Sequence, residues 1–148
     1  MTTIPQSVID AAQAGMKATK IPASVTIAQW ALESGFGAHM PPNSNNPFGI
    51  KTMGGYPSVV VGTTEYAHGK VQHIPQAFAV FPSLAEAFTV HDQLLATSHF
   101  YANARSKLPD AEAFAQALTG VYATDPNYGN LLISLMRQHQ LEQYNVAA

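Results

Sequence analysis

The stretch IPASVTIAQWALESGFG, residues 21–37, predicts a buried helix that ends in a carboxylic acid. Pro22 suits a first helical position, and the apolar residues after it cover nearly every side of the helix. Gly35 suits the left-handed residue that ends a helix. Glu33 thus lies beside apolar neighbours at the negative end of the helix dipole, and both features are expected to raise the pKa of its carboxyl group. A Glu that merely points out of the last turn is the alternative.

A carboxylic acid that stays protonated near neutral pH can act as a general acid, so Glu33 is the first candidate catalytic residue. Asp92, inside a predicted helix, is expected to be exposed or paired. Glu65 lies in a strand-like segment, where a half-exposed structural Glu is equally expected. Two carboxylates from different lobes that flank one bond are what glycoside hydrolysis requires. The remaining carboxylates fit helix caps, first helical turns or solvated helix faces: Asp10, Glu86, Asp110, Glu112, Asp125 and Glu142.

The rest of the chain is predicted to be mainly helical, of α+β class, and to form one domain over residues 1–148. Residues 36–57 form a long loop rich in Gly, Pro and Asn, and residues 58–81 predict two or three antiparallel strands. The small β lobe is thus placed at about 52–81. Helices are expected over residues 5–20 and 22–33, from Ser83 to about His99, from Pro109 to about Leu118, and from Asp125 to about Gln143.

Composition excludes several classes of protein. Seven Lys and Arg stand against nine Asp and Glu, a net charge of −2, so the basic surface of a nucleic-acid-binding protein is missing. Cysteine is absent, which removes thiolate metal sites and nucleophiles. No apolar run is long enough to insert stably in a membrane, and the first residues lack the features of a secretory signal.

The histidines do not have the spacing of a metal site, and no metal or other cofactor is predicted. His68 and His73 should face opposite sides of a strand, whereas His91 and His99 could share a helix face without a third ligand. Aromatic residues are candidates for stacking on sugar rings, although a core position is favoured for Trp30 and Phe48. The candidates are Trp30, Phe36, Phe48, Tyr56, Tyr66, Tyr122 and Tyr128.

Four motifs, in order from about Ile21 to Leu141, resemble those of one enzyme family. IPASVTIAQWALESGFG is similar to the catalytic-helix motif of glycoside hydrolase family 73, the glucosaminidase domain family. Residues 46–51, NPFGIK, resemble the family's NNxFGIK segment, and residues 81–83, FPS, resemble a shortened strand-to-helix step. Residues 122–128, YATDPNY, match its YATDPxY motif.

The resemblance implies a lysozyme-like fold in which an α lobe and a small β lobe flank a cleft. It also implies cleavage of the β-1,4 bond after N-acetylglucosamine in peptidoglycan, with Glu33 as the acid. Glu65 is the position that fits a second Glu of the β lobe, and Tyr122 or Tyr128 fits a functional Tyr. Asn46, Phe48, Lys51 and Tyr66 are the expected substrate contacts, although a local Asx turn is an equal alternative for Asn46.

Two mechanisms and several rival functions stay open at this point. Glu65 would activate water on the opposite face and give inversion, or the substrate's own acetamido group would act as nucleophile, oriented by Tyr122 or Tyr128. A muramidase or lytic transglycosylase is the nearest rival, followed by a non-catalytic glycan-binding or assembly module and a small helical interaction domain. Action in the periplasm or cell wall requires delivery by phage lysis, by a secretion system or within a larger protein, and an inhibitor or carrier protein is left open.

Overall fold

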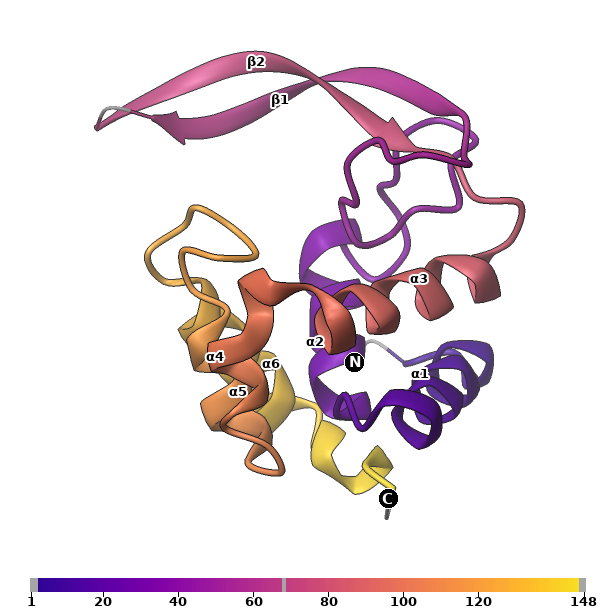
Figure 1. The fold of residues 1–148 in the computed structure, drawn as a ribbon, viewed down its shortest axis with the longest axis vertical. Coiled ribbons are helices and arrows are strands. Elements are labelled where there is room, and N and C mark those ends of the chain that lie inside the picture. The colour runs from indigo at the N-terminus through magenta and orange to yellow at the C-terminus, as the bar shows by residue number, and fades with distance from the viewer. Residues whose placement is uncertain (1–2, 68, 147–148) are drawn as a thin grey trace.

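The computed structural model describes residues 3–67 and 69–146, with residues 65–67 described by their backbone only. Helices are the main regular structure in this part of the chain, and one antiparallel hairpin supplies its strands (Figure 1). The predicted α+β class, mainly helical, is confirmed. The elements are α1 (Gln6–Thr19), α2 (Ala23–Ser34), β1 (Ser58–Ala67), β2 (Lys70–Ala79), α3 (Leu84–Thr97), η1 (His99–Tyr101), α4 (Ala102–Arg105), α5 (Ala111–Ala117), α6 (Tyr128–Gln138) and η2 (Leu141–Tyr144).

Helix α2 lies at the centre of the helical part and packs against α1, α5, α6 and η2. Every residue from Ile21 to Ala31 is buried, as the apolar pattern predicts. Three of these buried residues are polar, namely Ser24, Thr26 and Gln29. The helix ends where Gly35 adopts a left-handed conformation, with φ 57°, and its N–H donates to the carbonyl of Ala31.

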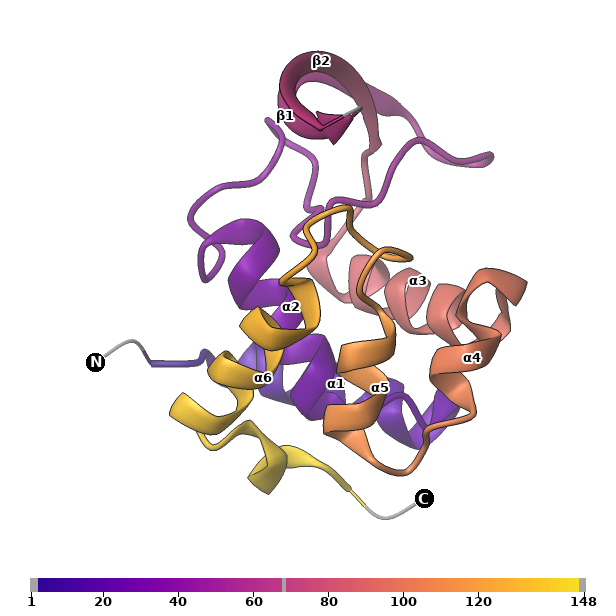
Figure 2. The same cartoon turned by 90° about the vertical axis from the view of Figure 1, so that its left-hand side faces the viewer.

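The hairpin of β1 and β2 lies beyond one end of α2 and reaches out over the helices (Figures 1 and 2). Its register pairs Gly62 with Pro75, whose missing N–H matters little in a two-stranded ribbon. The loop segment 50–52 adds to the other edge of β2, because Ala79 N donates to Ile50 O at 3.0 Å and Thr52 N donates to Ala77 O at 2.9 Å. The end of the 36–57 loop is thereby fixed to the hairpin.

The capping residues explain which predicted helix ends agree with the structure and which do not. The side chains of Ser83 and Asp110 accept from backbone N–H groups at 3.1 and 3.0 Å, as predicted. Asp125 is not an N-cap: its carboxylate accepts from Asn127 N at 2.8 Å in a turn, so α6 begins only at Tyr128. The last helix ends early, at Gln138, because Gln140 is left-handed with φ 52°.

The segment after α3 was not predicted as helical. η1 and α4 occupy residues 99–105 and are too short to leave a periodic pattern in the sequence. His99 therefore lies outside α3 and does not share a helix face with His91. No helix in the described part of the chain is both long and apolar enough to cross a membrane.

Candidate active site

A cleft of about 470 Å³ lies where the end of α2, the hairpin and the segment before α6 meet. The predicted cleft between the Glu33 helix and the β lobe is therefore present. Its lining residues come from four parts of the chain: Leu32 and Glu33; His39, Pro41, Asn46, Phe48, Gly49 and Lys51; Thr63, Thr64 and Phe78; Tyr122, Ala123, Thr124, Asp125, Tyr128 and Leu131.

Glu33 occupies the last turn of α2 and is exposed in the cleft. The turn is held by the next residue, since the Ser34 hydroxyl donates to Trp30 O and accepts from Gly37 N at 2.8 Å. The buried apolar side chains of α2 belong to the core, whereas Glu33 lies on the cleft side of the helix and is not buried among them. A Cβ placed on Gly49 would lie 3.6 Å from Glu33 Oε1, so the backbone at Gly49 closely approaches the carboxylate.

Two tyrosines lie beside Glu33. The rings of Tyr122 and Tyr128 stack with centroids 5.8 Å apart and planes 9° apart. Tyr122 donates its hydroxyl hydrogen to Phe48 O at 2.8 Å, whereas the Tyr128 hydroxyl accepts from Gln29 Nε2 at 2.9 Å. Tyr128 also hydrogen-bonds Glu33. Of the two, Tyr128 is thus the one tied to the candidate acid.

Burial raises the pKa of both hydroxyl groups well above 10, and the negative charge of Glu33 raises each pKa further. A phenol with such a pKa keeps its hydrogen throughout the physiological pH range. Tyr122 and Tyr128 are therefore hydrogen-bond donors in the cleft wall.

Asn46 and Phe48 line the cleft but are almost wholly buried, being 1% and 0% exposed. Asn46 Nδ2 donates to Ile50 O at 2.8 Å and to Ala79 O at 2.9 Å, which ties the loop to the hairpin. Its Oδ1 accepts from Phe48 N at 3.4 Å, so the Asx-turn alternative is confirmed. The Phe48 ring stacks on His91 at 4.1 Å. Both side chains support the cleft from behind, and their contact with the glycan stays a prediction.

Three other predicted site residues are Lys51, Glu65 and Tyr66. Lys51 is exposed and lines the cleft. Glu65 and Tyr66 lie in β1 opposite Gln72 and Val71, and their side chains fall outside the described residues. Both stay predictions.

The described part of the structure has two further hollows, and one of them adjoins the cleft. A second hollow, of about 380 Å³, shares Gly49, Lys51 and Tyr122 with the cleft and continues past Met53 and Tyr101. A hollow of about 690 Å³ at the opposite end of α6 is lined by no described carboxylate.

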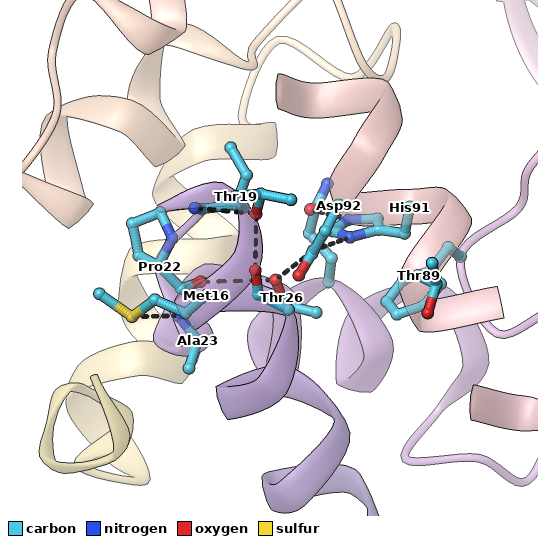
Figure 3. Close-up of polar contacts among 12 residues, drawn as sticks. Met16, Thr19, Pro22, Ala23, Thr26, Thr89, His91 and Asp92 are labelled. Carbon is cyan, nitrogen blue, oxygen red and sulfur yellow. Dashed lines mark hydrogen bonds and ion pairs between the residues drawn. The ribbon is translucent and has the colours of Figure 1, made fainter. Parts of the chain in front are cut away.

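A buried polar chain behind the cleft was missed by the sequence reasoning. His91 Nε2 lies 2.6 Å from Gln29 Oε1, and His91 Nδ1 lies 2.8 Å from Asp92 Oδ1. Thr26 donates to the same Asp92 oxygen at 3.1 Å (Figure 3). Asp92 is fully buried and paired, so the exposed alternative is wrong. The available signal was Thr26 and Gln29 on an otherwise apolar helix. Across the described ranges, no group of three His, Asp or Glu side chains is arranged to hold a metal ion.

A family model described as "Glucosaminidase: Mannosyl-glycoprotein endo-beta-N-acetylglucosaminidase" matches residues 9–141. The chain belongs to this glucosaminidase family, glycoside hydrolase family 73. The resemblance carried by the four sequence motifs is confirmed. The match begins within α1 and ends at the start of η2, so the glucosaminidase sequence includes the whole cleft.

Relatives of known name support this placement in the glucosaminidase family. A "Probable N-acetylmuramidase" of Lactococcus lactis is 38% identical over 84% of this chain and 30% of its own length. The "Peptidoglycan hydrolase FlgJ" of Escherichia coli K12 is 35% identical over 86% of this chain and 43% of its own length. The chain thus spans less than half the length of these curated relatives.

The fold agrees with that of solved structures. A peptidoglycan hydrolase mutant from Sphingomonas sp. A1 superposes with a TM-score of 0.81 at 32% identity, covering 95% of this chain and 97% of that one. The helical part and the hairpin together therefore make up the glucosaminidase fold.

Proposed function

We propose that this chain hydrolyses peptidoglycan and cleaves the β-1,4 glycosidic bond after N-acetylglucosamine. The observation that carries the proposal is Glu33, a carboxylic acid exposed in the cleft and hydrogen-bonded to Tyr128. Family membership and the names of two relatives and a structural neighbour point to the same polymer. Such a reaction places its activity in the periplasm or cell wall.

In the proposed mechanism Glu33 protonates the glycosidic oxygen as the bond to the leaving sugar breaks. Glu65, on β1 two residues beyond the cleft-lining Thr63, removes a proton from the water that attacks the opposite face, which gives inversion. The second route uses the substrate's acetamido oxygen as the nucleophile and needs no second carboxylate. Tyr128 then supplies a hydrogen bond that steadies Glu33 or the acetamido group as charge develops.

The glycan strand is proposed to follow the line from the cleft into the hollow beside Met53 and Tyr101. Lys51 and Tyr122 lie where the two hollows meet, so they are placed to contact successive sugars. Tyr66 is proposed as a further contact on the hairpin side. This arrangement fits an enzyme that cuts within a strand, since the cleft beside Glu33 continues into a second hollow.

The bond that is cleaved has a specific rival. The Lactococcus lactis relative is named a probable N-acetylmuramidase, which would cut on the other side of the disaccharide. The test digests purified peptidoglycan with the wild type, reduces the products with borohydride and identifies the new ends by mass spectrometry. Reduced N-acetylglucosamine ends are expected.

Other ends would overturn the proposal in defined ways. Reduced muramic ends would identify a muramidase, and anhydromuramic ends a lytic transglycosylase. Release of no ends under conditions where a control enzyme acts would leave a glycan-binding module. Glu142→Gln is the matched control for Glu33→Gln, since Glu142 is an exposed glutamate outside the cleft lining.

A further inference from the structure

We infer that Asp92 and His91 form a positioning relay that acts through Gln29 and makes the Tyr128 hydroxyl a hydrogen-bond donor toward Glu33. The relay rests on the proposed function, because it gives a purpose to a buried chain of polar groups that ends at the candidate acid. It runs from α3 through α2 to the start of α6, and Figure 3 shows its Asp92, His91 and Thr26 portion.

The direction of the relay follows from the donors and acceptors along it. Asp92 Oδ1 accepts from Thr26 and lies 2.8 Å from His91 Nδ1. His91 Nε2 faces the carbonyl Oε1 of Gln29 at 2.6 Å. Gln29 Oε1 can only accept a hydrogen bond, so the hydrogen of this contact lies on His91 Nε2.

Gln29 connects His91 to Tyr128 in the cleft wall through the two ends of its side-chain amide. Because its carbonyl oxygen faces His91, its amide Nε2 must face Tyr128, to which it donates at 2.9 Å. The Tyr128 hydroxyl oxygen then accepts a hydrogen bond from Gln29, and its own hydrogen remains available for donation to Glu33. With the amide turned over, Tyr128 would give that hydrogen to Gln29 and would no longer donate to Glu33.

The relay is a feature that stability alone does not explain. Asp92 is fully buried, and its Oδ2 has no hydrogen-bond partner among the described residues. Burying a carboxylate is unfavourable unless it is paired and hydrogen-bonded, and an apolar residue in its place is often neutral or stabilising. The chain also keeps glycine at residue 15, where a Cβ would lie 1.7 Å from that oxygen. A buried carboxylate with an unpartnered oxygen and a glycine inside a helix both go against the usual rules of stability, and such exceptions are expected at functional sites.

The decisive variant is Asp92→Asn, which keeps the shape and removes the charge. With the Asn oxygen in the place of Asp92 Oδ1, the ring hydrogen is held on Nδ1 and not on Nε2, so Gln29 would turn its amide toward Nε2 and reverse the relay. The expected result is a fall in kcat of about 10- to 100-fold on soluble peptidoglycan fragments with KM little changed. Gln93→Ala, an exposed neighbour on the same helix, is the matched control and should keep wild-type activity.

A double-mutant cycle separates positioning from loss of structure. In a Tyr128→Phe background the relay has no hydroxyl to direct, so Asp92→Asn should lower kcat no further. Equal loss in both backgrounds, or full activity of Asp92→Asn alone, would overturn the relay. An active wild type and an inactive Glu33→Gln variant in the same assay would leave the proposed function standing, whereas an inactive wild type would remove it.

A measurement on the wild type covers the case in which Asp92→Asn does not fold. Nuclear Overhauser contacts from the Gln29 amide hydrogens should be stronger to the Tyr128 ring than to the His91 ring. The reverse pattern would show a turned amide and would refute the relay without any substitution.

Discussion

The hydroxyl groups of Tyr122 and Tyr128 point to different partners although their rings are stacked 5.8 Å apart. Tyr122 donates to the Phe48 carbonyl, and Tyr128 hydrogen-bonds Glu33. The motif that contains both residues cannot distinguish them, because either could face the cleft. From these partners we propose that Tyr122 fastens the loop and that Tyr128 serves Glu33, the proposed acid.

Tyr128→Phe is therefore expected to lower kcat by about 10²-fold, the usual effect of removing one hydrogen-bond donor from a transition state. Tyr122→Phe removes a hydroxyl from the stacked partner and should cost less in kcat. Initial rates on soluble peptidoglycan fragments, with melting temperatures of both variants, provide the check. A larger loss of kcat for Tyr122→Phe would reverse the assignment.

Asn46→Asp should destabilise the fold by roughly 2–4 kcal/mol. The change removes two donors from the buried carbonyls of Ile50 and Ala79 and places a carboxylate among them. Urea denaturation measures the free energy of unfolding, and Asn130→Asp on the exposed side of α6 is the control. Equal midpoints for the two variants would mean that Asn46 does not hold the loop to the hairpin.

Gly15→Ala should also destabilise, by roughly 1–3 kcal/mol, because the new methyl group overlaps the Asp92 carboxylate. Ordinary helix propensity favours Ala over Gly by about 1 kcal/mol, so the two effects have opposite signs. Gly54→Ala, where a Cβ meets nothing within 4 Å, is the control and should be close to neutral. A raised melting temperature for Gly15→Ala would contradict the packing of α1 on Asp92.

Acid should weaken the surface pair of Glu112 and Arg137. The Arg137 guanidinium hydrogen-bonds Glu112 at 2.6 and 2.9 Å and lowers the pKa of that carboxyl from 4.5. A lowered pKa in the folded state stabilises the fold above about pH 4.5, and this stabilisation is lost as the pH falls through the lower value. The pair is exposed, so Glu112→Gln should cost less than about 1 kcal/mol at pH 7 and nothing at pH 2. A difference that grew toward acid would contradict the sign.

The sequence predicts the longer helices, the hairpin and the place of Glu33 at the end of α2 because each has a local signal. The apolar run of residues 21–31, the caps at Ser83 and Asp110 and the change to β-branched residues after Pro57 are all short-range patterns. The buried partners of Asp92 were out of reach, since Thr26 lies 66 positions away and the contact exists only after α2 and α3 pack. The tie between Asn46 and the hairpin was out of reach for the same reason, as its partner Ala79 belongs to the far strand.

The most direct test of Glu33 as the acid compares cleavage and binding in one preparation. Glu33→Gln and Glu142→Gln are incubated with the same peptidoglycan; new reducing ends are counted, and protein that sediments with the polymer is measured. We predict that Glu33→Gln sediments like the wild type and produces no ends above background, while Glu142→Gln does both. Release of ends by Glu33→Gln at a rate near that of the wild type would contradict the account.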